Sequence, residues 1–285
     1  MTRNAFRIVQ MTDLHLMDLK EDTETFSLIK NTVTSCHPDL IVITGDLTMI
    51  HENQKLLIQL RELMDSFGVL WTVVFGNHDH ECTLSLDEQA DLLMKGKYCL
   101  FEKGNVNLRG VGNHYITLTK GNQTIALLGF LDSHNSRIDE INGENIWSYD
   151  YIDKNQIQDA ILEITALKNS SNLKSSIFFF HIPLVEFKQI LETNKSEIEG
   201  SCYEEVCSSN YDSGFFDEVN KTNTLKGIFV GHDHVNDYSF KKEGCLLAYG
   251  RCTGHYNYTM PEFKKGARII DINDTGSISS YVITE

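Results

Sequence analysis

Several features that mark other classes of protein are scarce or missing in this sequence. No apolar run among the 285 residues has the length that crosses a bilayer, and the N-terminus lacks the basic and apolar regions of a signal peptide. Proline occurs only three times, and we find no internal repeat, low-complexity tract or linker. The sequence therefore predicts a cytoplasmic protein that folds as one domain over residues 1–285 and has no membrane segment.

Cysteine and positive charge are also used sparingly. The seven cysteines are scattered and odd in number, without zinc-type spacing, so we expect reduced thiols and no disulfide framework. Lysine and arginine number 25 against 40 acidic residues, a formal net charge of −15. This charge balance disfavours non-specific binding to nucleic acid or to an anionic membrane. An anionic substrate is still possible, because bound divalent metals can reverse the local field.

What the sequence does contain is a set of apolar runs that end in metal-binding residues. Buried strands are predicted near residues 6–12, 40–44, 70–75, 176–180 and 227–230. In α/β sheets, ligands bind outside the carboxyl ends of the strands, so the residues that follow these runs should gather in one place. These candidate ligands are Asp13, His15, Asp46, Asn77, His181, His232 and His234.

The rest of the chain supplies helices and further strands. Helices with one apolar face, near residues 26–36 and 56–67, alternate with the first three strands and predict a parallel sheet. Asp153 and Gln156 have the spacing of a capping box at the start of another helix. Polar residues 193–213 are predicted to form a long, mobile wall over the cleft. Further strands, with antiparallel pairing among the first three, are expected at 98–101, 114–119, 124–131, 245–249, 267–272 and 277–283.

Seven side chains are too many for one ion and suit two, with the carboxylate of Asp46 between them. Two metals about 3.5–4 Å apart can hold a water between them, lower its pKa and clamp phosphoryl oxygens. The mixture of imidazole and oxygen ligands suits Mn, Fe, Zn or Co better than Mg or Ca. The sequence therefore predicts a cofactor of two divalent ions.

In order and spread, these residues resemble the signature of the calcineurin-like metallophosphoesterase superfamily over roughly residues 7–235. The matching blocks are Asp13-Leu14-His15, Gly45-Asp46, Gly76-Asn77-His78-Asp79, His181 and Gly231-His232-Asp233-His234. The run His181-Ile182-Pro183-Leu184 is similar to the branch related to purple acid phosphatases. The resemblance implies an α/β fold in which two mixed β-sheets pack face to face with helices outside.

The resemblance also implies roles for individual residues. His78 would contact the leaving-group oxygen, and Asp79 would orient His78. Purple acid phosphatases carry a tyrosine three residues after the bridging Asp, where this chain has Met49, so we expect a divalent pair and no coloured ferric site. The implied ligands are Asp13, His15 and His234 for one metal, Asn77, His181 and His232 for the second, and Asp46 as the bridge.

Three residues outside the signature are candidates for substrate contacts. Arg251, His255 and His134 each follow a predicted strand; Arg251 and His255 are candidates for contact with the phosphate, and His134 for a position facing the cleft. The remaining histidines are expected to be ordinary loop or surface residues; they are His37, His51, His80 and His114.

The function that these observations favour is hydrolysis of a small phosphate ester, either a monoester or a diester, by attack of a water or hydroxide that bridges two metals. A nuclease of the same superfamily is an alternative, and the absence of basic clusters with interleaved aromatics counts against it. A non-catalytic metal-binding scaffold is a second alternative. Such a protein would be expected to lose a ligand or His78, and none is lost here.

Overall fold

The computed structural model describes residues 5–141 and 143–285. The strands are β1 (Ala5–Met11), β2 (Leu40–Thr44), β3 (Leu70–Val74), β4 (His114–Lys120), β5 (Gln123–Phe130), β6 (Ser136–Ile141), β7 (Glu144–Tyr149), β8 (Ser175–Phe179), β9 (Leu225–Val230), β10 (Ser239–Lys242), β11 (Cys245–Tyr249), β12 (Gly266–Asn273) and β13 (Ile278–Thr284). The helices are α1 (Lys20–Cys36), α2 (Gln54–Ser66), α3 (Leu86–Leu93), α4 (Lys154–Ser171), α5 (Val185–Thr193) and α6 (Phe215–Asn220), with short 3₁₀ turns η1 (His78–Glu81) and η2 (Lys195–Glu197).

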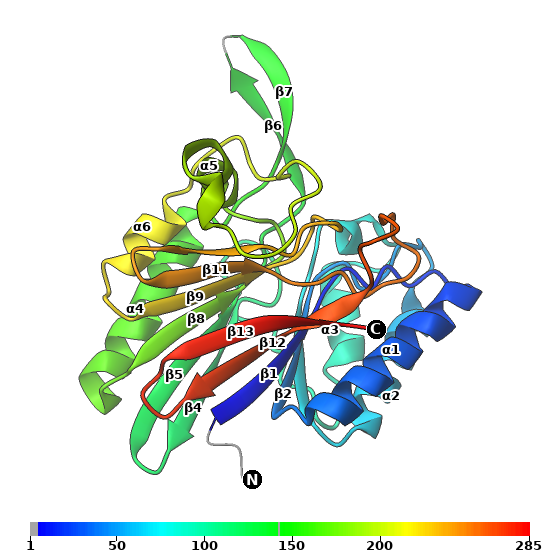
Figure 1. Ribbon diagram of the computed structural model, residues 1–285, viewed down its shortest axis with the longest axis horizontal. Coiled ribbons are helices and arrows are strands. Elements are labelled where there is room, and N and C mark those ends of the chain that lie inside the picture. Colours follow the sequence, from blue (N-terminus) through cyan, green and yellow to red (C-terminus); the bar gives the residue numbers. More distant parts are fainter. Residues whose placement is uncertain (1–4, 142) are drawn as a thin grey trace.

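Most of the strands belong to two mixed sheets (Figure 1). The first has the order β13-β12-β1-β2-β3, in which β1, β2 and β3 run parallel and β12 and β13 are antiparallel to their neighbours. The second has the order β10-β11-β9-β8-β5-β4, with a parallel centre and antiparallel strands at both edges. The predicted α/β fold with two mixed sheets and helices is confirmed.

The alternation of side chains along each buried strand builds the layers. In β2, Ile41 and Ile43 join the apolar cluster that lies against helices α1, α2 and α3, whereas Leu40 and Val42 join a cluster shared with the second sheet. Strand β8 divides its residues in the same way between the intersheet cluster and the cluster under α4, α5 and α6. Because successive side chains of a strand point to opposite faces, a fully apolar strand is expected where both faces are covered.

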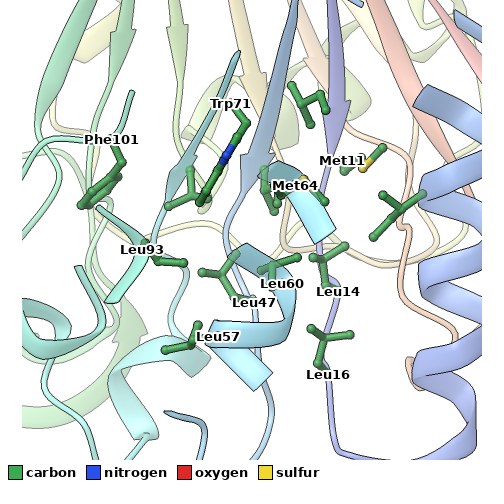
Figure 2. Packing of buried hydrophobic residues seen from close by; sticks show 14 of the residues in the cluster. Met11, Leu14, Leu16, Leu47, Leu57, Leu60, Met64, Trp71, Leu93 and Phe101 are labelled. Carbon is green, nitrogen blue, oxygen red and sulfur yellow. The ribbon is translucent and has the colours of Figure 1, made fainter. Parts of the chain in front are cut away.

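The apolar stripe that the sequence predicts for α2 packs against the first sheet. Leu57, Leu60 and Met64 of α2 point toward the sheet and lie close to Leu47 and Trp71 (Figure 2). All five side chains are almost completely buried. Burying one side chain of this size contributes roughly 1.5–3 kcal/mol, so this stripe holds α2 against the face of the first sheet.

Three local expectations differ from the structure. Residues 98–101 form no named strand; instead Tyr98 and Leu100 add single backbone hydrogen bonds to Trp71 at the edge of β3. The hairpin of β6 and β7 was not expected, although Asn142-Gly143 is a sequence signal for such a turn. His114 is 3% exposed and not at the surface, because it starts β4 and its ring packs on Phe130.

The segment of residues 193–213 is bonded to the chain that follows β9. Backbone bridges join Glu199 to Ser239 and Cys202 to Asn236, and the Asn236 side chain accepts hydrogen bonds from the N–H groups of Tyr203 and Glu204. The segment thus lies beside the residues that carry the last candidate ligands, and its mobility stays a prediction. Among the described residues, no helix combines the length and the apolar character needed to cross a bilayer.

Candidate metal centre

The candidate ligands lie where strands of both sheets end. One pair follows β1, single residues follow β2, β3 and β8, and a second pair follows β9. Since these strands are parallel within each sheet, their carboxyl ends meet at one edge. The structure brings all seven predicted ligands to this edge and buries each of them: Asp13, His15, Asp46, Asn77, His181, His232 and His234.

The backbone turns sharply at these positions. Asp13, His15, Asp46 and His232 have φ values of 53°, 45°, 54° and 82°, in the left-handed region that residues other than glycine rarely adopt. Each such residue costs of order 1–3 kcal/mol, and this conformation persists only where the surrounding structure enforces it. The turns direct the side chains inward at the point where each strand stops.

The side chains form two groups that share one carboxylate. The first group holds Asp13, His15, Asp46 and His234, and its ligand atoms all lie within 4.8 Å of one another. The second group holds Asp46, His181 and His232 at the same spacing. Asn77 joins the second group, since its Oδ1 is 3.1 Å from His181 Nε2. Two ligand sets with Asp46 in common are the geometry that a dinuclear site requires.

Unpaired buried atoms show that these residues fit metal ions. His15 Nε2 lies 3.1 Å from Asp46 Oδ2, yet neither atom has a hydrogen-bond partner. His232 Nε2 and His234 Nδ1 are also buried without a partner. A buried polar atom without a partner costs roughly 1–3 kcal/mol, and most native proteins leave few of them. Four such atoms in one cluster are explained if the side chains converge on cations.

Hydrogen bonds from the far side of two imidazole rings set their tautomers. His181 Nδ1 lies 2.7 Å from the carbonyl oxygen of Thr44, which can only accept, so in the neutral ring that would bind a metal Nδ1 carries the proton and Nε2 offers its lone pair. His15 Nδ1 lies 3.1 Å from the thioether sulfur of Met49, with the same consequence. Met49, which stands where purple acid phosphatases have tyrosine, thus supports a ligand without itself facing the centre.

The charges of the cluster stabilise one another. Burial alone would raise the pKa of Asp13 and Asp46, but the adjoining imidazoles hold both well below the ordinary value. Burial opposes protonation of His15 and His181, yet the two carboxylates raise the pKa of His15 to about 9 and of His181 to about 10. Burial lowers the pKa of His232 to about 3, and the charge of His181 adds to that effect. The anionic pair therefore draws positive charge into the site.

Two glycines allow the ligands to pack this closely. A Cβ atom on Gly76 would lie 2.2 Å from Asp46 Oδ1, and one on Gly45 would lie 2.4 Å from His181 Nδ1. Gly45 also has a φ of +88°. Any other residue at these positions would displace a candidate ligand.

A family model described as calcineurin-like phosphoesterase matches residues 6–236, which include every candidate ligand. The chain belongs to the calcineurin-like phosphoesterase family. A solved structure of a dimetal phosphatase from Danio rerio superposes with a TM-score of 0.61 at 11% identity and covers 99% of each chain. At this identity the likeness shows the fold alone.

Relatives of this chain carry phosphatase names. The chain is 26% identical to "Probable inactive purple acid phosphatase 28" of Arabidopsis thaliana, over 94% of this chain and 75% of the relative. It is 28% identical to "Phosphatase DCR2" of Saccharomyces cerevisiae, over 87% of this chain and 47% of that protein, so it spans about half of the yeast relative. The predicted likeness to the purple acid phosphatase branch is confirmed.

The side chains of His78 and Asp79 have different partners and are not paired as the resemblance implies. Asp79 is buried and accepts hydrogen bonds from the backbone N–H groups of Leu47 at 2.9 Å and Gly76 at 2.8 Å. The His78 ring lies instead with Nδ1 2.8 Å from Glu81 Oε2. Asp79 therefore holds two ligand-bearing loops together, and the carboxylate that lies beside the His78 ring is that of Glu81. Both His78 and Glu81 belong to η1, where residues three apart lie on one side.

The side chain of Arg251, a predicted phosphate contact, is bound to other residues of the chain. Its side chain is 6% exposed and pairs with Asp237 at 2.5 Å. Its guanidinium also lies 3.3 Å from the centroid of the Phe263 ring and donates to the carbonyl oxygen of Lys264 at 2.6 Å. The charge of Arg251 is thus paired with Asp237, and the ring of Phe263 covers one face of its guanidinium.

The other two residues predicted to contact the substrate are also hydrogen-bonded or paired with other side chains. His255 lies 3.3 Å from Thr25 Oγ1 in α1 and 3.2 Å from the carboxylate of Glu285. His134 is 2% exposed and lies 3.0 Å from Gln156 Oε1 at the start of α4. A negative partner or nearly complete burial makes each unsuited to an anionic ligand, so neither is kept as a substrate contact.

Three residues beside the candidate ligands were not predicted. The ring of Tyr149, at the end of β7, lies 4.3 Å from that of His232, and the ring of Tyr258 lies 4.3 Å from that of His234. Glu81 is the third, because its carboxylate lies beside the ring of His78, which in turn adjoins the ring of the candidate ligand His15. The spacing of His78 and Glu81 is a usable sequence signal, whereas the two tyrosines stand in segments whose patterns say nothing of the site.

Proposed function

We propose that this chain is a phosphohydrolase that depends on two divalent metal ions and cleaves the ester bond of a small phosphate ester. The observation that carries the proposal is the sharing of Asp46 between two buried ligand groups. Imidazole and oxygen donors together favour Mn, Fe, Zn or Co. Two such ions would activate water for attack on phosphorus and neutralise charge on the phosphoryl oxygens.

The chain's own residues hold that arrangement rigid. The backbone N–H of His78 donates to Asp46 Oδ1 at 3.0 Å, which fixes the shared carboxylate. The carbonyl of Thr44 and the sulfur of Met49 fix two imidazole rings. Supporting hydrogen bonds of this kind orient metal ligands and raise their basicity. The ligand set is thus preorganised, so little rearrangement is needed when ions and substrate bind.

His78 is the side chain best placed to act on the leaving group. Its ring lies 5.3 Å from that of the ligand His15, and its side chain is 27% exposed, so it borders the centre and reaches solvent. Its neighbour Asn77 places its amide oxygen beside His181, whereas His78 belongs to neither group of converging ligand atoms. A protonated His78 held by Glu81 would donate a proton to the departing oxygen, an effect typically worth roughly 10²–10⁴-fold.

A catalytic protein is favoured over a non-catalytic scaffold. Three Arabidopsis thaliana relatives are named as probably inactive, but here every candidate ligand is present and converges, and His78 adjoins the cluster. The acidic balance of the chain favours a small phosphorylated substrate over nucleic acid or a membrane surface.

The test is turnover of p-nitrophenyl phosphate and bis(p-nitrophenyl) phosphate by protein reconstituted with Mn. We expect turnover that requires the metal and is lost in Asp46→Asn. The matched control is Asp18→Asn, because Asp18 is 54% exposed and forms a surface ion pair with Lys55. Turnover that survives both chelation and Asp46→Asn would contradict the proposal. So would no turnover of either ester with any of the four metals bound.

A further inference from the structure

The β6–β7 hairpin stands out from the body of the molecule, above the sheets and beside α5 (Figure 1). Its register pairs Ser136 with Tyr149 and Ile138 with Trp147. Because side chains alternate along a strand, Ile138, Trp147 and Tyr149 share one face of the hairpin. Ile138 is 59% exposed and Trp147 is 54% exposed, so this face presents apolar surface to solvent.

The opposite face of the hairpin is occupied by contacts within the chain. Arg137 pairs with Asp139 at 2.6 Å, and its guanidinium lies 4.9 Å from the centroid of the Tyr151 ring. Ser148 is buried, and its hydroxyl accepts a hydrogen bond from the N–H of Asn210 at 2.9 Å. These contacts tie the base of the hairpin to the body on this face, whereas Ile138 and Trp147 are more than half exposed, and we call their face the uncovered face.

The uncovered face is continuous with the candidate metal centre. The Tyr149 ring meets that of His232 edge-on, with centroids 4.3 Å apart. The Trp147 ring meets that of Tyr149 edge-on, with centroids 4.6 Å apart. The rings of Trp147, Tyr149 and the candidate ligand His232 therefore contact one another in series, from the solvent to the metal centre.

We propose that Tyr149 and Trp147 form a subsite for the organic group of the substrate. It selects phosphate esters that carry an aromatic or other flat apolar group. With the phosphoryl group at the metal centre, the organic group of the ester would lie along the face of Ile138 and Trp147. Aromatic rings that meet edge-on or in offset stacks gain roughly 0.5–1.5 kcal/mol beyond burial of area. The inference rests on the proposed function, because it places the phosphate at the same centre.

Fluorescence tests the subsite without requiring turnover. The chain has two tryptophans, and Trp71 is fully buried, so acrylamide quenches Trp147 selectively. In zinc-loaded protein, benzylphosphonate should reduce this quenching, whereas methylphosphonate, which has the same head group and no ring, should not. Equal quenching with both ligands at saturation would overturn the subsite. Protection that instead grows with protein concentration and needs no ligand would also overturn it, because a second copy would then cover the face.

A kinetic comparison tests whether the subsite selects substrates. Phenyl and 2-naphthyl phosphate have leaving groups of nearly equal acidity and different aromatic area. Trp147→Ala should lower the ratio of their kcat/KM values, naphthyl over phenyl, about threefold to tenfold, and Trp147→Phe should restore part of it. The matched control is Ile146→Ala, on the opposite face of the same strand. An unchanged ratio in Trp147→Ala, or the same fall in Ile146→Ala, would overturn the assignment.

The two assays separate this inference from the proposed function. Protection of Trp147 by benzylphosphonate without turnover of any ester would support the subsite and refute the phosphohydrolase. Turnover with an unchanged substrate ratio and no protection of Trp147 would support the phosphohydrolase and refute the subsite.

Discussion

Replacing Glu81 by glutamine tests how His78 is oriented. His78 Nδ1 lies 2.8 Å from Glu81 Oε2, and the two side chains are 27% and 52% exposed. A hydrogen bond to a charged group contributes about 1.5–3 kcal/mol when buried, but exposure and screening reduce this pair to about 0.5–1 kcal/mol. Glu81→Gln should therefore lower kcat/KM for an alkyl phosphate ester roughly twofold to fivefold. His78→Asn should lower it roughly 10²–10⁴-fold, because the proton donor itself is removed.

The choice of ester makes this test specific. An alkoxide leaves poorly without a proton, whereas p-nitrophenolate is stable and leaves with little help. Both variants should therefore lose less activity on the nitrophenyl ester than on the alkyl ester, with both metals retained. An equal loss on both esters, with metal content unchanged, would show that His78 positions the phosphoryl group and is not the proton donor.

Asp79→Asn is the contrasting variant. Its two carboxylate oxygens each accept a backbone hydrogen bond, and an amide nitrogen in place of one oxygen would face an N–H donor. Such a mismatch in a buried site costs about 1–3 kcal/mol, so the melting temperature should fall by several degrees. Activity on both esters should fall together. A variant with unchanged melting temperature and a selective loss on the alkyl ester would return the orienting role to Asp79.

Three further predictions concern single residues. Protein loaded with iron should be colourless, because Met49 cannot supply a phenolate; a visible charge-transfer band that disappears on reduction would contradict this. Gly76→Ala should lose metal binding, measured by elemental analysis, because its Cβ would lie 2.2 Å from Asp46 Oδ1. Burial lowers the pKa of His114 from 6.5 to about 4, so the folded protein resists a proton that the unfolded chain accepts. The free energy of unfolding should fall by up to about 3 kcal/mol as the pH drops through that interval, and the slope should be shallower in His114→Gln.

The candidate ligands could be found from sequence because each stands directly after a buried strand. Apolar runs such as residues 40–44 are long enough to be recognised, and the rule that ligands gather at strand ends then places Asp46 without knowledge of the loops. The outer helices were found for a similar reason, since the stripe of α2 repeats at helical spacing and is buried as a unit.

Side-chain partners from distant parts of the chain could not be found in this way. Arg251 has the residue type of a phosphate ligand, but its partner Asp237 is set by the path of the chain after β9. His255 is similarly held by α1 and by Glu285. Tyr149 reaches His232 because it stands at the end of β7, where the hairpin rejoins the body of the molecule, a long-range arrangement that no local pattern encodes.

The most direct test of the dinuclear centre is the metal content of wild-type protein beside Asp46→Asn and His15→Asn. Protein reconstituted with Mn and freed of excess metal should hold close to two equivalents, because Asp46 belongs to both ligand groups and His15 to only one. Asp46→Asn should weaken both sites, and His15→Asn should retain about one equivalent. A wild-type value of one equivalent, unchanged by excess metal, would contradict the dinuclear centre.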